Sequence, residues 1–193
     1  MTVLKGKRIV IFDLEIKKTI EQCSKGWQSY DEMGISCLCM FDYFTGRYRV
    51  FDDYNKDEAV RILCTYDLVV GFNTIGFDWK VVQAEWIKSS DNLAILAARQ
   101  SKDYDILAAI WSSIGGFSKG YKLDDVAFDS IGVRKSGDGA LAPKLYQAGR
   151  LADVIDYCIN DVLIEKTLFE FVINNGFINR AGKTVQLELP KIT

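Results

Sequence analysis

The chain has 193 residues, of which 49% are hydrophobic and 26% charged, and its 24 Lys and Arg against 26 Asp and Glu give a formal net charge of −2. It contains no histidine, which excludes serine or cysteine nucleophiles paired with histidine, histidine-ligated zinc and a histidine general base. Acid, base or metal chemistry must therefore come from carboxylates, tyrosine, lysine or thiolate, and the net charge alone gives no sign of avid nucleic-acid binding.

Length and the N-terminal segment indicate one domain and a cytoplasmic location. A chain of this length normally forms one domain, which we expect to cover residues 1–193. The N-terminal apolar run, Ile9 to Phe12, is too short for a signal peptide, and the uncharged stretch of residues 68–77 is too short to span a bilayer. We therefore expect a cytoplasmic protein without a membrane partner.

The first half of the chain alternates strand and helix patterns. Continuous or alternating apolar residues predict strands over residues 7–14, 34–40, 47–51 and 67–72. The second and third of these are joined around Gly46 and form a hairpin. Helices are predicted over residues 55–64, where Asn55 can cap the first turn, and over residues 77–88.

The second half of the chain is mainly helical. Its first elements are a short strand turning into a helix at residues 104–107, a helix at 122–130 and a glycine-rich loop at 132–139. Apolar positions at helical spacing predict a long helix from Leu151 to a C-cap at Gly176. Residues 182–189 alternate like a terminal strand that pairs with the residues just before it. The order of elements predicts an α/β fold with a mixed sheet of five to six strands flanked by helices.

Two cysteines, Cys37 and Cys39, share one face of the second predicted strand and suggest a pair of soft metal ligands. We interpret them instead as core residues, because a structural zinc site needs four ligands at tight spacing and the sequence has no C-x-x-C pair. The odd number of cysteines agrees with a reducing compartment.

Acidic residues lie at the C-terminal ends of the predicted strands, which is where α/β sheets form their functional sites. Asp13 and Glu15 end the first strand, and a spacing of two puts both side chains on one face. Two carboxylates on one face repel each other unless a cation neutralises them. Taken alone, this pair is better explained as two solvated acids at a strand end.

Two further acidic positions extend this pattern. Asp78 begins a helix after a loop that starts at Asn73, and by itself it is best explained as an acid that complements the helix dipole. A spacing of four stacks Tyr157 and Asp161 on one helical face, which alone is typical of a half-buried tyrosine beside an exposed acid. Together, four carboxylates converging on one sheet edge are the hard oxygen ligands that two Mg²⁺ or Mn²⁺ ions need.

Three motifs of the sequence resemble those of a known family. Residues 12–15, Phe-Asp-Leu-Glu, resemble the D-x-E motif of the DEDD 3′–5′ exonucleases of the ribonuclease-H-like fold. Residues 73–78 fit the N-x-x-x-F-D motif of that family, and residues 157–161 fit Y-x-x-x-D, which defines its DEDDy branch. The chain resembles proofreading domains of family B DNA polymerases and small predicted ribonuclease-H-like exonuclease proteins, and the likeness to the second group covers nearly its whole length.

The resemblance implies an exonuclease that uses two Mg²⁺ or Mn²⁺ ions. Asp13, Glu15 and Asp161 would hold the ion that activates water, and Asp13 and Asp78 would hold the second ion. Tyr157 would orient the attacking water or help to deprotonate it, and the usual tyrosine pKa of about 10 favours the orienting role. Hydrolysis would release nucleoside monophosphates from a 3′ end.

The resemblance also implies which residues contact the substrate. Asn73 and Phe77 would shape the pocket for the terminal nucleotide, together with Leu14 and Ile16, which flank Glu15. Ile16 stands where many relatives carry Thr or Ser, and this removes a hydroxyl but no metal ligand.

Further side chains are candidates for nucleic-acid contacts. Lys119 and Lys122 form the favoured patch for contacts with the nucleic-acid backbone. The aromatic candidates for base stacking are Trp27, Tyr30, Trp79, Trp111, Phe117 and Tyr121. Asp105 is an additional acid that either belongs to the site or caps the following helix.

The sequence therefore predicts a 3′–5′ exonuclease acting on single-stranded DNA or RNA ends. Two alternatives stay open: a non-catalytic nucleic-acid-binding or scaffold module that kept the fold, and a nuclease of the same fold that cuts internally. The presence of all four carboxylates and of Tyr157 favours the exonuclease. A helicase or a polymerase is the kind of protein partner we consider, and the oligomeric state is left open.

Overall fold

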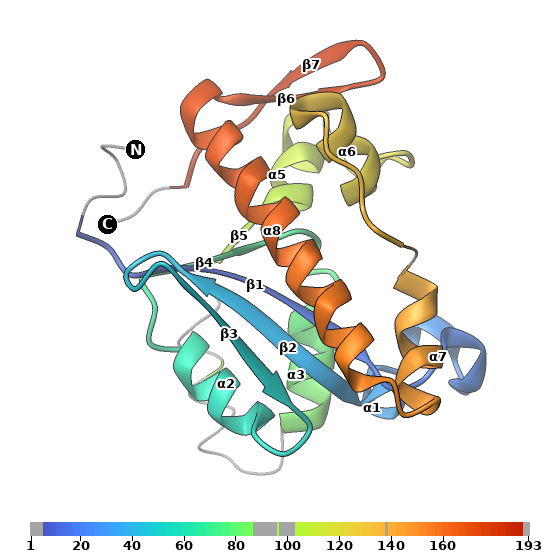
Figure 1. Cartoon of the computed structure of the whole chain (residues 1–193). Helices are drawn as coiled ribbons and strands as arrows, with labels where there is room; N and C mark the ends of the chain where they lie inside the picture. The colour runs from blue at the N-terminus through green and yellow to red at the C-terminus, as the bar shows by residue number, and fades with distance from the viewer. Residues whose placement is uncertain (1–5, 87–95, 97–102, 138, 191–193) are drawn as a thin grey trace.

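Five strands form a mixed sheet in the order β3-β2-β1-β4-β5 in the computed structural model, which describes residues 6–86, 96, 103–137 and 139–190 (Figure 1). The strands are β1 (Ile9–Ile16), β2 (Ile35–Asp42), β3 (Arg47–Asp52), β4 (Leu68–Gly71) and β5 (Asp103–Asp105). β2 pairs antiparallel with β1 and β3, whereas β4 pairs parallel with β1 and β5. The predicted α/β fold with a mixed sheet is confirmed, with five strands.

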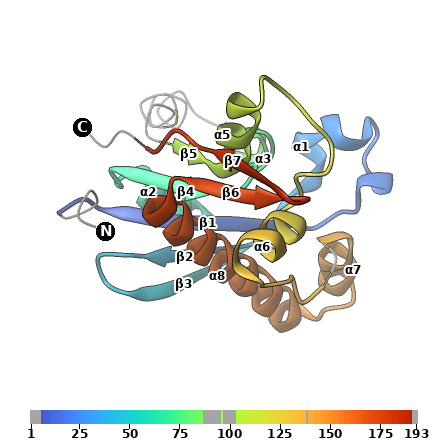
Figure 2. The ribbon, with the colours of Figure 1, turned by 90° about the horizontal axis from the view of Figure 1, so that it is seen from above.

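Helices cover both faces of this sheet (Figures 1 and 2). The longest helix, α8 (Leu151–Asn175), lies across one face and packs against β1 and β2. Packed on the same side are α5 (Ile106–Ser113), α6 (Leu123–Ile131) and α7 (Ala142–Gln147). The opposite face is covered by α2 (Lys56–Leu63) and α3 (Asp78–Trp86), with the short α1 (Tyr30–Met33) beside α3.

Alternation along β1 divides the core into two clusters. Ile9 and Ile11 pack in the cluster on the α8 side, whereas Val10 and Phe12 pack in the cluster on the α2 and α3 side. Because successive side chains of a strand point to opposite faces, the odd-numbered residues that follow, beginning with Asp13, face α8. The strand therefore presents its acids to the longest helix.

The C-terminal residues form a separate hairpin. β6 (Phe177–Arg180) and β7 (Lys183–Gln186) pair antiparallel, as the pattern of residues 182–189 predicts, but they do not join the main sheet. Arg180 ties this hairpin to α6 through ion pairs with Asp125 at 3.2 Å and Asp129 at 2.9 Å.

Local differences from the sequence prediction are small. Asn55 stands at the N-cap of α2, but its side chain accepts a hydrogen bond from the Asp52 backbone N–H at 2.8 Å instead of capping the helix. The irregular residues after β1 contain two 3-10 turns, Ile20–Gln22 and Gly26–Gln28, and a third turn spans Gly139–Leu141.

Two sequence predictions extend beyond the described residues. The predicted end of α3 at residues 87 and 88 lies outside the described ranges, as does residue 138 of the predicted glycine-rich loop. Among the helices that are described, none combines the length and the apolar character needed to cross a membrane.

Candidate active site

Three carboxylates from two elements meet between the sheet and α8. Asp13 and Glu15 of β1 and Asp161 of α8 each offer an oxygen atom, and these atoms lie within 4.8 Å of one another. Glu15 is 7% exposed and Asp161 is 3% exposed. Carboxylates this close and this buried are unfavourable when ionised unless a cation compensates their charge.

The surroundings of these acids favour their protonated forms when no cation is bound. Desolvation, with the charge of Asp161 nearby, raises the pKa of Asp13 to about 8. Desolvation and the Asp13 charge raise the pKa of Glu15 well above its usual value. Desolvation also raises the pKa of Asp161, although the Lys135 ammonium lies 2.5 Å from its Oδ2 atom and acts in the opposite direction. One lysine therefore compensates only part of the charge.

Asp78 joins this group from the start of α3. The residue is 3% exposed, and desolvation followed by the charge of Asp13 raises its pKa well above the usual value. Its Oδ1 atom is buried and makes no hydrogen bond with any residue in the described part of the chain. The structure thus brings all four acids of the sequence motifs to one place.

The loop between β4 and α3 is held by Asp105. The Asp105 carboxylate accepts hydrogen bonds from the backbone N–H groups of Asn73 at 2.8 Å and Ile75 at 3.0 Å. It also caps α5 by accepting from the N–H groups of Leu107 and Ala108. Asn73 adopts a positive φ of 68°, a conformation that asparagine tolerates better than most residues. Of the two roles considered for Asp105, the structure supports the capping of α5. The same carboxylate also holds the loop between β4 and α3.

Glu165 is a further buried carboxylate that the sequence reasoning missed. It lies one helical turn after Asp161 on α8 and is 1% exposed. Its Oε1 atom accepts a hydrogen bond from the Phe72 N–H at 3.2 Å, while Oε2 has no hydrogen-bond partner among the described residues. The spacing of four that links Tyr157 to Asp161 continues to Glu165 and was the available signal.

Tyr157 lies beside the acids under the loop that precedes α7. The side chain is 8% exposed, and its hydroxyl makes no well-formed hydrogen bond with any described residue. The Lys135 ammonium lies 5.1 Å from the centre of the ring, and Gly137 of the same loop approaches the ring edge. Burial raises the pKa of the hydroxyl above its usual value. Sequence analysis does not assign Lys135 to the site.

A cleft of about 610 Å³ opens at the acidic cluster. Its lining includes Asp13, Asp161 and Glu165, and also Asn73 and both lysines predicted to contact the nucleic-acid backbone, Lys119 and Lys122. Of the aromatic candidates for base stacking, the cleft is lined by Trp27, Trp111, Phe117 and Tyr121. Trp27 is 64% exposed and Phe117 72% exposed, so both rings are available to a ligand.

The other predicted substrate residues lie differently. Phe77 packs edge-on against Trp27, with ring centres 5.8 Å apart, and so supports a ring that lines the cleft. Leu14 and Ile16 are 3% and 8% exposed and pack in the core cluster on the α2 and α3 side. Because their side chains point away from the acids, substrate contact through these two side chains is not supported.

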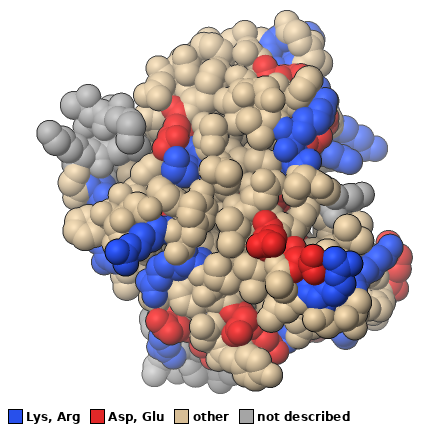
Figure 3. Space-filling model, viewed as in Figure 1, with Lys and Arg blue, Asp and Glu red and all other residues tan. Residues whose placement is uncertain are grey.

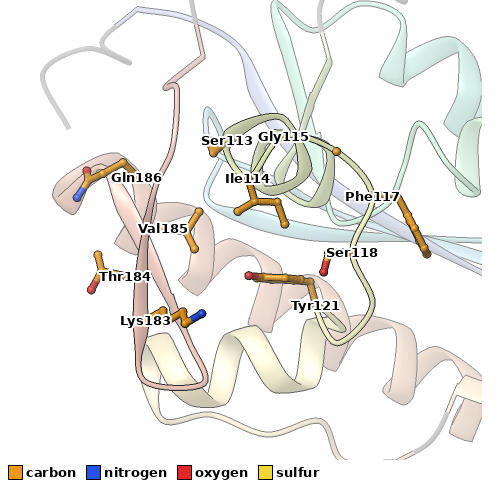
Figure 4. Close-up of a pocket in the computed structure, with 11 residues that line it drawn as sticks. Ser113, Ile114, Gly115, Phe117, Ser118, Tyr121, Lys183, Thr184, Val185 and Gln186 are labelled. Carbon is orange, nitrogen blue, oxygen red and sulfur yellow. The ribbon is translucent and has the colours of Figure 1, made fainter.

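A second hollow, of about 790 Å³, lies between the segment that joins α5 to α6 and the β6–β7 hairpin (Figure 4). Ile114 and Val185 face it from the two sides, whereas Phe117 projects to the far side of the segment (Figure 4). None of the described residues that line this hollow carries a carboxylate. On the face of the molecule seen in Figure 3, positive and negative side chains are interspersed. The cleft at the acidic cluster is therefore the stronger candidate for an active site.

The residues present fit divalent cations. Three buried carboxylate oxygens have no hydrogen-bond partner within the described part of the chain: Asp78 Oδ1, Asp161 Oδ1 and Glu165 Oε2. Buried polar atoms normally find a partner, and oxygen ligands of this kind suit Mg²⁺ or Mn²⁺. Asp13, Glu15 and Asp161 are close enough to share one ion.

Comparison with known proteins agrees with this fold. Residues 35–173 match a family model described as the RNase_H superfamily. The family B DNA polymerase from the hyperthermophilic archaeon Pyrobaculum calidifontis has a similar fold, with a TM-score of 0.62 and 19% sequence identity. The match covers 87% of this chain but 25% of the polymerase chain, so the likeness concerns a quarter of that protein. No curated protein matches the sequence.

Proposed function

This chain belongs to the RNase_H superfamily, and from that premise we propose that it is a divalent-metal-dependent 3′–5′ exonuclease acting on DNA or RNA. The fold and the acidic cluster make a nuclease the reaction class to expect. The observation that carries the proposal is the group of Asp13, Glu15 and Asp161 oxygens within 4.8 Å of one another, with Asp78 beside them.

The acids supply ligands for two cations in this proposal. When bound, two Mg²⁺ or Mn²⁺ ions would activate water and stabilise the leaving 3′ oxygen. Asp13, Glu15 and Asp161 would hold one ion, and Asp13 and Asp78 would hold the other. Ionised carboxylates are required for this role, so cation binding would release the protons that the raised pKa values retain.

Tyr157 is proposed to orient the attacking water. Its hydroxyl is a buried donor beside Asp161, without a well-formed hydrogen bond to any described residue. Because burial raises its pKa, the hydroxyl stays protonated at neutral pH and donates a hydrogen bond rather than accepting the proton of water. Replacing it in Tyr157→Phe would slow hydrolysis and leave metal binding unchanged.

The cleft suits a single-stranded end better than a duplex. Trp27 and Phe117 are exposed aromatic rings in its lining, and unpaired bases stack on such rings. Lys119 and Lys122 offer positive charge to phosphates in the same lining. The protein would therefore accept a frayed or single-stranded 3′ terminus.

Linear and circular single strands of the same sequence test the proposal. With Mn²⁺ or Mg²⁺, the wild type should degrade the linear strand and spare the circle, because the circle has no end. Asp161→Asn should lose this activity, whereas Asp156→Asn, an exposed acid on the same helix, should retain it. Cleavage of the circle would favour internal cutting, and binding without any metal-dependent cleavage would favour the non-catalytic module.

A further inference from the structure

Three buried thiols lie directly beside the acidic cluster. Cys37 and Cys39 of β2 and Cys158 of α8 are each 0% exposed, and their sulfur atoms lie within 4.8 Å of one another. The register of the sheet sets Cys37 opposite Glu15 and Cys39 opposite Asp13. A pair of thiols on β2 therefore accompanies the pair of carboxylates on β1, on the same face of the sheet.

The third thiol connects the two groups. Cys158 Sγ lies 3.4 Å from the Asp13 carbonyl oxygen and 3.7 Å from the Asp13 carboxylate oxygen Oδ2. Asp13 thus stands between hard oxygen ligands on one side and soft sulfur ligands on the other. Thiolates select cations such as Zn²⁺ and Cd²⁺, whereas carboxylates suit Mg²⁺ and Mn²⁺.

The separations match a tetrahedral site after small movements. Bonds of about 2.3 Å from zinc to sulfur and about 2.1 Å to oxygen place two sulfurs about 3.8 Å apart, and a sulfur and an oxygen about 3.6 Å apart. The three sulfur atoms lie within 4.8 Å of one another, and the distance from Cys158 Sγ to Asp13 Oδ2 is 3.7 Å. Asp13 also lines the cleft, which gives a cation an entry path.

We propose that Cys37, Cys39 and Cys158, with Asp13 as the fourth ligand, form a binding site for a thiophilic d¹⁰ cation such as Zn²⁺ or Cd²⁺. Binding releases the thiol protons to solvent. It also takes the Asp13 carboxylate away from the acidic cluster, so the cation inhibits the nuclease. The inhibition rests on the proposed function, whereas binding of the cation does not.

Cadmium binding tests the site without any assay of activity. The variant Cys23→Ala with Cys64→Ala keeps only the three clustered thiols and serves as the parent protein. In excess Mg²⁺, a Cd²⁺ titration of this parent should give sulfur-to-cadmium charge-transfer absorption that saturates at one ion per chain. X-ray absorption should then report three sulfur ligands and one oxygen ligand. Absence of the charge-transfer band in the folded parent would overturn the proposal.

A matched substitution then locates the ion. Adding Cys39→Ala to the parent should lower its Cd²⁺ affinity about tenfold or more, and Cys39→Ser provides a second variant with a similar side-chain volume. Circular dichroism establishes that each variant is folded. Unchanged Cd²⁺ affinity in a folded Cys39 variant would contradict the assigned ligands.

Inhibition is measured on the same proteins. Cd²⁺ should slow Mg²⁺-dependent hydrolysis by the parent, and the Cys39→Ala form should need about tenfold more Cd²⁺ for the same effect. Equal inhibition of both proteins would overturn the inhibitory role. If neither protein hydrolyses nucleic acid with Mg²⁺ alone, the proposed function fails, and the cadmium titration decides the metal site by itself.

Discussion

Asp13 makes the stability of the metal-free protein depend on pH. Its pKa is about 8 in the folded protein, against the usual 3.8 that we expect in the unfolded chain. The folded state therefore retains a proton that the unfolded chain loses, and this contribution to stability is fully present below about pH 4 and is lost as the pH rises towards 8. Asp13→Asn cannot ionise, so the melting temperature of the metal-free variant should fall less over this interval.

Thermal unfolding in excess EDTA measures this difference. Wild type and Asp13→Asn should have similar melting temperatures at the acid end of the interval, and the variant should be the more stable protein at the alkaline end. Asp156→Asn, which changes an exposed acid of α8, is the control and should follow the wild type. Parallel curves for wild type and Asp13→Asn would contradict the assigned ionisation.

Glu165 is expected to increase metal affinity. Glu165→Gln can keep the hydrogen bond from the Phe72 N–H, but it removes a carboxyl group that can ionise beside Asp13, Asp78 and Asp161 when a cation binds. Mutation of residues that surround the metal ligands typically lowers metal affinity about 10- to 100-fold, and we expect Glu165→Gln to lose affinity by about that factor. The Mn²⁺ dependence of the melting temperature measures it, with Glu170→Gln on the same helix as control. Equal Mn²⁺ dependence in wild type and Glu165→Gln would contradict this role.

At the scale of elements, Asp105 joins α5 to the loop before α3. One carboxylate accepts from two N–H groups of the helix and two of the loop, so Asp105→Ala removes a helix cap and a loop tether together. We expect the free energy of unfolding to fall by about 2 kcal/mol. Chemical denaturation measures this loss, and Asp57→Ala, an exposed acid of α2, should change the free energy by less than about 0.5 kcal/mol. A similar effect of both substitutions would contradict the account.

Regular elements were predicted well because their periodicity is a local property. The strand expected at residues 7–14 is β1 (Ile9–Ile16), and the long helix expected from Leu151 to a cap at Gly176 is α8. The D-x-E and Y-x-x-x-D spacings therefore placed their side chains on the correct faces. The short 3-10 turns after β1 were missed, because three residues carry no detectable period.

Two site residues depend on contacts that no local pattern encodes. Lys135 reaches Asp161 because the loop before α7 folds back over α8, and the sequence shows it only as a charged residue in a glycine-rich loop. Glu165 becomes a buried acid because α8 lies against the end of β4. In both cases, a contact between segments that are distant in the sequence places the residue in the site.

In the whole molecule, the lysines that would bind the phosphates of the substrate lie in the cleft at the acidic cluster. Lys119 and Lys122 lie in the cleft lining, so the double variant Lys119→Ala and Lys122→Ala should bind single strands with a salt-dependence slope that is smaller by about 1.4. Affinities measured over a range of salt concentrations give this slope, with catalysis prevented by EDTA. Arg47→Ala with Arg49→Ala on the edge strand β3 is the control pair. An unchanged slope in the lysine variant would show that Lys119 and Lys122 do not contact the nucleic-acid backbone.

The arrangement of the sheet was less predictable than its elements. The sequence predicts a mixed sheet of five to six strands, but the order β3-β2-β1-β4-β5 and the exclusion of the β6–β7 hairpin depend on long-range pairing. The convergence of Asp13 and Asp161, separated by most of the chain, was expected from the placement of acids where α/β sheets form their sites and from the motif resemblance, and it is present in the structure. Spacing within each motif could not by itself have established that convergence.

The most direct test of the central claim follows the products of a single strand labelled at its 5′ end. With Mn²⁺, the wild type should produce a ladder that shortens one nucleotide at a time from the 3′ end, and Asp13→Ala should leave the strand intact. A ladder of this kind from wild type alone agrees with a 3′–5′ exonuclease that works through the acidic cluster. Intact DNA and RNA strands with the wild-type protein, or equal degradation by Asp13→Ala, would contradict the account.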